Sequence, residues 1–206
     1  MTTARDLLTV ALDTDPGHPP EQGDLSLALA GAELLDLLDA RALTLDAELI
    51  VPGDRPTTED RLLESAAASL QRQTPYEPVE EWLWRRGRGL ASAYLAAFEE
   101  EGRFARQRPR RLPSWTGVAT LVDSPARRWA GERWEAREPV LATLACAARI
   151  GGTPQDASPV LPEETDEAVV TVLAAVDDAV TELTAVRQRR DIEQAAFDNV
   201  WRGPGG

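Results

Sequence analysis

The chain of 206 residues carries a formal charge of −13, with 43% hydrophobic and 28% charged residues. This composition is typical of a globular protein that buries one sizeable core. No apolar run approaches the roughly 20 residues of a membrane-spanning helix, and the N-terminus lacks the features of a signal peptide. We therefore expect one domain over residues 1–202 with a flexible tail at 203–206. The expected location is cytoplasmic, peripheral on the inner face of a membrane, and the single Cys146 fits a reducing compartment.

The first predicted element is a short helix or strand over 5–12, followed by a Pro- and Gly-rich loop at 13–23. The central element is 24–45, whose spacing predicts an amphipathic helix. Its apolar face carries a glycine, Gly31, which indicates either a closely approaching neighbouring backbone or, more commonly, ordinary tight core packing. The opposite, solvent-facing side holds Glu33, Asp36 and Asp39.

A small hairpin is predicted for 43–51, because two apolar runs flank Asp46-Ala47-Glu48. Thr57 or Thr58 should then cap a helix to about Gln71. A Pro-initiated element follows, in which Trp82 faces the core and Trp84 lies nearer the surface with three arginines. The next helix, 89–101, ends in three acids that oppose its dipole, so we expect a nearby arginine to offset them.

Residues 103–123 predict a second hairpin with five arginines on one arm and Trp115 near the tip. Ser124-Pro125 and Glu138-Pro139 each predict the start of a helix. A linker at 151–162 precedes a long helix from Glu163 to about Arg190 with one apolar stripe. A short helix should then carry Phe197 and Trp201.

Charged residues are unevenly distributed along the sequence. Residues 1–70 hold 14 acids against four arginines, or −10, whereas 85–111 hold eight arginines against three acids, or +5. A polarised molecule can turn a basic face toward an anionic surface, although such segments are equally often plain solvated surface. Tryptophan prefers the bilayer interface, and each arginine near an anionic bilayer contributes about 1 kcal/mol.

Enzyme templates are missing from the sequence. The glycines of residues 84–92 are followed by no lysine, and no G-x-S-x-G elbow occurs. One histidine, His18, and one cysteine cannot build a conventional metal cluster. We therefore expect no catalytic residue, no metal and no cofactor.

Several motifs together resemble the Golgi phosphoprotein 3 family in its shorter bacterial form. They are a glycine-containing Leu-rich helix, a hairpin, a Pro-Thr segment leading into a Leu-rich helix, a Trp-containing helix and an E-x-G turn. In this sequence the corresponding segments are 31–43, 45–51, 56–70, Trp82 and 100–102. The order and spacing match over 6–180.

The resemblance implies a mainly α fold, a single helical domain with two small β-hairpins. It also implies phosphatidylinositol 4-phosphate binding, membrane insertion of the second hairpin, self-association through that hairpin, and an adaptor role toward a protein client. In the family, the headgroup site consists of a tryptophan, an arginine and two arginines three apart. The corresponding positions here are Glu21, Ala30, Arg88 and Ala91, so only Arg88 matches.

With the stacking ring and two phosphate donors missing, we expect weak, generally electrostatic binding to anionic phospholipid rather than specific headgroup recognition. The candidate headgroup residues are Arg85, Arg86 and Arg88. The candidate membrane-contact residues of the hairpin are Arg106, Arg108, Arg110, Arg111 and Trp115.

Two other functions stay open at this point. An Arg-rich hairpin after a helix is also typical of a winged-helix nucleic-acid binder, although the acids at 99–101 and the negative net charge disfavour it. Alternatively, the hairpin and Trp115 form a contact between copies of a purely protein-binding scaffold.

Overall fold

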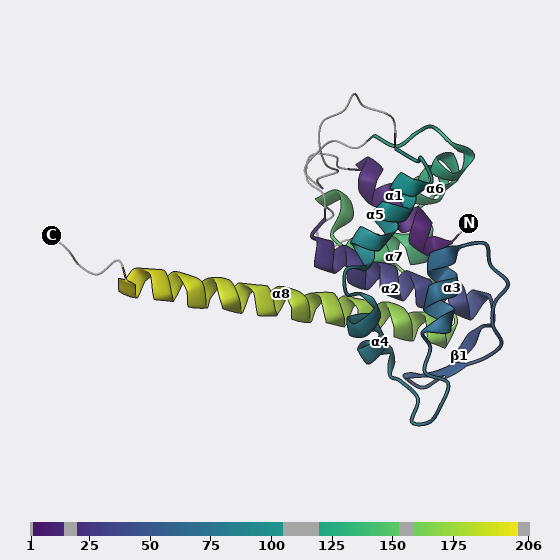
Figure 1. The fold of residues 1–206 in the computed structure, drawn as a ribbon, viewed down its shortest axis with the longest axis horizontal. Helices are drawn as coiled ribbons and strands as arrows, with labels where there is room; N and C mark the ends of the chain where they lie inside the picture. Colours follow the sequence, from purple (N-terminus) through teal and green to yellow (C-terminus); the bar gives the residue numbers. More distant parts are fainter. Residues whose placement is uncertain (1, 15–19, 105–119, 153–158, 202–206) are drawn as a thin grey trace.

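The computed structural model describes residues 2–14, 20–104, 120–152 and 159–201. The part described is mainly helical, which confirms the predicted fold class (Figure 1). Its helices are α1 Thr3–Thr14, α2 Gln22–Asp39, α3 Arg61–Ala68, α4 Val79–Arg86, α5 Leu90–Glu100, α6 Pro125–Glu135, α7 Pro139–Ala147, the 3-10 turn Ile150–Gly152 and α8 Glu167–Trp201. One antiparallel hairpin joins β1, Leu43–Asp46, to β2, Leu49–Pro52.

Helix α2 lies at the centre of the domain, packed by α1, α4, α5, α7 and the first half of α8. At Gly31, α2 and α8 pack tightly, because a Cβ added there would collide with the Val176 side chain. The neighbours of Gly31 are side chains, so this glycine reflects tight core packing rather than the approach of a neighbouring backbone.

The prediction that three acids of α2 face solvent is wrong for two of them. Glu33 is fully buried and Asp36 is partly buried, whereas Asp39 is exposed. Helices cover α2 on nearly all sides, so its residues have little free surface to occupy. A buried carboxylate requires a charged or hydrogen-bonding partner, and α2 receives such partners from distant parts of the chain.

Helix starts follow the capping signals in two cases and depart from them in a third. The Ser124 hydroxyl accepts the Arg127 N–H at 3.1 Å at the start of α6, and the Glu138 carboxylate caps α7. Both starts were predicted. The cap of α3, however, is Asp60, which accepts the N–H groups of Leu62 and Leu63, rather than Thr57 or Thr58. The Thr58 hydroxyl instead accepts the N–H of Asp60.

The β1–β2 hairpin matches its predicted position, with Leu45 opposite Ile50. Of the second hairpin, the structure describes the bridge between Phe104 and Leu121, and residues 105–119 lie outside the described part. The prediction of a hairpin there stays untested between these two positions.

Helix α8 is a single element from Glu167 to Trp201, so the predicted break after Arg190 is wrong. Its first half packs on α2, α4 and α7, and its second half extends away from the rest of the domain toward the C-terminus (Figure 1). Among the described residues, no helix combines the length and hydrophobicity needed to cross a bilayer.

Candidate anion-binding surface

A shallow pocket of about 280 Å³ lies where the start of α2, the turn between α4 and α5, and the middle of α8 meet. Arg88 is exposed on its wall, in the turn before α5. The pocket is lined by Gln22, Gly23, Ser26, Leu27, Trp84, Gly87, Arg88, Gly89, Ser92 and Leu183. The one headgroup position that matches the family pattern, Arg88, is therefore at an open cavity.

Glycines give this pocket its shape. Gly89 has a left-handed backbone with φ of 69°, which a residue with a side chain adopts only at a cost. A Cβ on Gly87 would contact the Leu83 carbonyl at 2.6 Å, so the turn can pass close to α4 only with glycine there. The Ser26 hydroxyl accepts the Ala91 N–H at 3.1 Å and holds the start of α5 against α2.

A second guanidinium borders the pocket at Gly23. Arg187 of α8 donates to Asp24 at 2.6 Å, and its side chain occupies the space that a Cβ on Gly23 would need. Helix α2 begins at Gln22, and the Asp24 side chain in its first turn is directed to Arg187. Arg187 is thus positioned beside the cavity with its charge already compensated.

Arg85 does not line the pocket. Its guanidinium forms a two-point ion pair with Glu77, at 2.6 and 2.7 Å, and donates to the Ser69 carbonyl at 3.2 Å. The same group stacks 5.0 Å from the centre of the Trp82 ring. The hydrogen bond with Glu77 raises the pKa of Arg85, and the side chain remains 44% exposed. Arg85 therefore has a protein partner but keeps an outward surface.

Arg86 points into the protein rather than toward a ligand surface. It donates to both oxygens of Glu33, at 2.7 and 2.9 Å, and to the Leu62 carbonyl at 3.0 Å. The Tyr94 hydroxyl donates to the same carboxylate at 3.1 Å. Burial raises the pKa of Glu33, although the hydrogen bonds from Arg86 and Tyr94 oppose the shift. The Arg86 side chain is only 15% exposed, so we regard it as part of the core.

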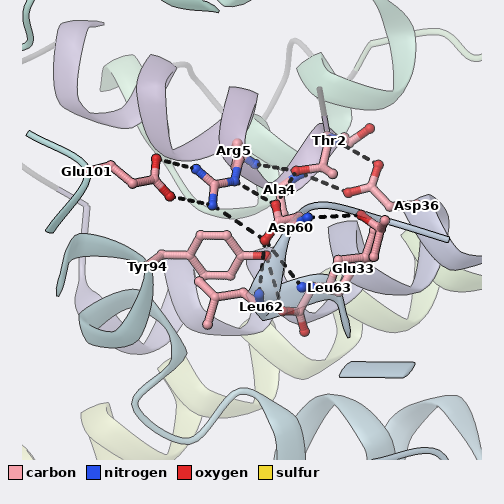
Figure 2. Close-up of polar contacts among 12 residues, drawn as sticks. Thr2, Ala4, Arg5, Glu33, Asp36, Asp60, Leu62, Leu63, Tyr94 and Glu101 are labelled. Atoms are coloured by element: carbon pink, nitrogen blue, oxygen red, sulfur yellow. Dashed lines mark hydrogen bonds and ion pairs between the residues drawn. The ribbon is translucent and has the colours of Figure 1, made fainter. Parts of the chain in front are cut away.

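A second polar network joins α1 to three other segments (Figure 2). Arg5 forms ion pairs with Asp60 at 2.6 Å and with Glu101 at 2.7 Å. Hydrogen bonds from Arg5 and Arg103 lower the pKa of Glu101 to about 2, which confirms that arginine offsets one of the three acids at the end of α5. Sequence reasoning missed Arg5 and Asp60, because no local spacing links positions this far apart.

Asp36 belongs to the same region and caps α1 from outside that helix. Its two oxygens accept the N–H groups of Thr3 at 2.7 Å and Ala4 at 3.2 Å (Figure 2). Burial nevertheless raises the pKa of Asp36 to about 6, because desolvation outweighs these hydrogen bonds. The network stabilises the packing of α1 on α2 and does not face the pocket.

The hairpin residues predicted to contact a membrane lie outside the described residues. They are Arg106, Arg108, Arg110, Arg111 and Trp115. At the base of this segment, Arg103 pairs with Glu101 at 2.6 Å and lies 4.8 Å from the Phe98 ring centre. The structure thus gives protein partners to Arg103, the first arginine of the predicted basic arm.

The other family headgroup positions offer no second phosphate donor. Ala30 and Ala91 are buried, and Glu21, which is exposed, directly precedes the pocket residue Gln22. Among the described residues, no group of His, Cys, Asp and Glu is arranged to hold a metal ion. Arg88 is therefore the candidate contact for an anion, beside the hydroxyls of Ser26 and Ser92.

Comparison with curated proteins finds no significant match. The family model described as Golgi phosphoprotein 3 matches residues 4–200, which is nearly the whole chain. The match includes every described helix except the first residue of α1 and the last of α8. The chain therefore belongs to the Golgi phosphoprotein 3 family.

Proposed function

We propose that this protein is a non-enzymatic adaptor that associates peripherally with anionic phospholipid surfaces. Two observations support the proposal: membership of the Golgi phosphoprotein 3 family, and an exposed arginine, Arg88, on the wall of an open pocket. The observation that carries it furthest is the position of Arg88, because the neighbouring arginines already have carboxylate partners.

The pocket favours weak rather than specific headgroup recognition. A phosphate in it would meet one guanidinium, Arg88, and the hydroxyls of Ser26 and Ser92, whereas the Arg86 guanidinium is directed to Glu33. Specific phosphate recognition generally uses several charge-assisted hydrogen bonds, often two-point contacts from arginine. We therefore propose that phosphatidylinositol 4-phosphate is bound no better than other anionic lipids of equal charge.

Most of the attraction to an anionic bilayer beyond that of Arg88 would come from the segment 103–111, which is rich in arginine and free of acids. With each arginine contributing about 1 kcal/mol near an anionic bilayer, four of them would outweigh the contribution of Arg88. Arg85, which is 44% exposed, would add less because Glu77 already compensates its charge. The proposed surface is thus the pocket together with the basic arm.

Binding to vesicles tests this proposal. Wild-type protein should co-sediment with phosphatidylserine-containing vesicles and not with neutral phosphatidylcholine vesicles at low salt. Replacing Arg88 with Ala should weaken binding about fivefold, and R108A/R110A/R111A should weaken it by about 1 kcal/mol per charge. The matched control is R61A, because Arg61 is exposed at the start of α3 and does not line the pocket. Unchanged binding in R88A and in the triple variant would refute the surface.

The two alternative functions are separated in the same experiment. A nucleic-acid binder would retain duplex DNA on a filter at low salt more strongly than anionic vesicles. A purely protein-binding scaffold would lose self-association when residues 105–119 are deleted, without a matching change in vesicle binding. The proposed client is a protein whose membrane position the adaptor maintains, and its identification requires capture from the native membrane.

A further inference from the structure

The second half of α8 extends beyond the domain that the first half helps to build. Among the residues of α8 whose burial the structure describes, Val180 is the last buried one, and Arg187 forms an ion pair with Asp24 of α2. From Arg187 to Trp201 the helix extends away from the other helices for about 22 Å at 1.5 Å per residue (Figure 1). A helix segment of this length is marginal in water without packing on another surface.

One stripe of this projecting segment has the spacing of a helix-pairing seam. Val186, Arg190, Glu193 and Phe197 follow each other at intervals of four, three and four residues. Such intervals place the four residues along one side of the helix, as in the a and d positions of a coiled coil. Val186 is partly buried, whereas Arg190 and Glu193 are exposed and Phe197 is 57% exposed.

We propose that two copies of this protein pair antiparallel through this stripe of α8. With the two-fold axis between Asp191 and Ile192, Arg190 lies opposite Glu193 of the second copy. In the same register, Val186 lies opposite Phe197 of the second copy. Each contact then occurs twice, as an interface with two-fold symmetry requires.

The charges of the stripe select a second copy rather than an anionic bilayer as its occupant. Within the stripe, Arg190 and Glu193 are exposed and carry one charge of each sign. A bilayer of negative charge gains no net attraction from such a stripe, whereas an antiparallel copy places each Arg190 opposite a Glu193. The antiparallel arrangement also places opposite helix-dipole ends side by side.

The pairing should be weak, because the contact is short. It is smaller than the roughly 1,200 Å² that stable complexes bury. We therefore expect a dissociation constant on the order of 10 to 100 µM for the full chain, detectable by sedimentation velocity over a concentration series reaching about 1 mM.

Charge exchange tests the register. R190E alone and E193R alone each replace two attractive contacts with two repulsive ones, so each should weaken dimerisation about tenfold. The double variant R190E/E193R restores opposite charges at both contacts and should return the dissociation constant to within about threefold of wild type. The matched control is D191R, which makes the same change of charge as E193R on the other side of the helix.

Several results would overturn the proposal. The wild-type chain could stay monomeric up to about 1 mM, or the single variants could dimerise as tightly as wild type. Equally, the double variant could have a dissociation constant as high as those of the single variants, or D191R could weaken dimerisation as much as E193R does. Loss of self-association on deleting residues 105–119, with R190E unchanged, would assign it to the predicted hairpin instead. Loss of vesicle binding in R190E without any dimer would make a bilayer the occupant. Circular dichroism of each variant checks that the helix is retained.

Discussion

Replacing Arg86 with Met separates a structural role of this arginine from a role in ligand binding. The substitution keeps an unbranched apolar side chain but leaves the fully buried Glu33 without its ion pair at 2.7 Å. Tyr94 still donates one hydrogen bond to that carboxylate. Removing one partner of a buried pair generally costs about 3 to 5 kcal/mol, because the other charge stays buried and uncompensated. We expect R86M to lower the free energy of unfolding by about 3 kcal/mol. This value is at the low end of that range because Tyr94 keeps its hydrogen bond to the Glu33 carboxylate.

Urea unfolding followed by tryptophan fluorescence provides the measurement, since Trp82 is fully buried in α4, the helix that ends at Arg86. R86M/E33L, which replaces both charges with apolar groups, should recover only part of the loss, because it also leaves the buried Tyr94 hydroxyl without its acceptor. R88M is the control and should stay within about 0.5 kcal/mol of wild type, because Arg88 is exposed. A loss below about 1 kcal/mol in R86M, with lipid binding reduced, would show that the buried ion pair is not the main role of Arg86.

Two further predictions concern α2. G31A should cost about 1 to 3 kcal/mol in urea unfolding, since the new Cβ meets Val176, and G31A/V176A should recover part of it; a neutral G31A contradicts the close approach. The pKa of Asp36 is about 6 in the folded protein, against a reference value of 3.8, so the folded state binds this proton more tightly than the unfolded state does. Protonation of Asp36 therefore stabilises the fold fully below about pH 4, and this stabilisation is lost as the pH rises through 6. The stability of D36N relative to wild type should therefore rise by about 2 to 3 kcal/mol between pH 4 and pH 7, and a flat difference would refute the shift.

Local signals predicted much of the fold. The caps at Ser124 and Glu138 and the β1–β2 hairpin each depend on residues close in sequence. Such features are decided by backbone geometry and by a few neighbouring side chains, which a single sequence contains.

Long-range contacts could not be predicted in this way. Periodicity assigned Glu33 to solvent, because a carboxylate is normally exposed and its partner Arg86 lies 53 positions later. The same applies to Arg5, whose two carboxylate partners come from separate helices or their caps. The continuation of α8 past Arg190 was missed because its apolar stripe becomes mixed with charge there.

These ion pairs change how the basic segment should be interpreted. Arg85, Arg86 and Arg103 contribute to the +5 charge of residues 85–111, yet each has a carboxylate partner in the folded protein. Formal charge along the sequence therefore overstates what this segment offers to a membrane. Arg88 at its pocket gives the proposal its most specific test within the described residues.

The proposed lipid selectivity is tested most directly by one vesicle titration at low salt. Vesicles containing phosphatidylinositol 4-phosphate and vesicles containing phosphatidylserine are matched in surface charge, with neutral vesicles as the baseline. The account predicts weak binding to both anionic vesicles, equal within about threefold, and none to the neutral ones, as expected for attraction through charge alone. Binding to neither anionic vesicle would contradict the membrane role, and a preference above tenfold for phosphatidylinositol 4-phosphate would contradict the non-specific site at Arg88.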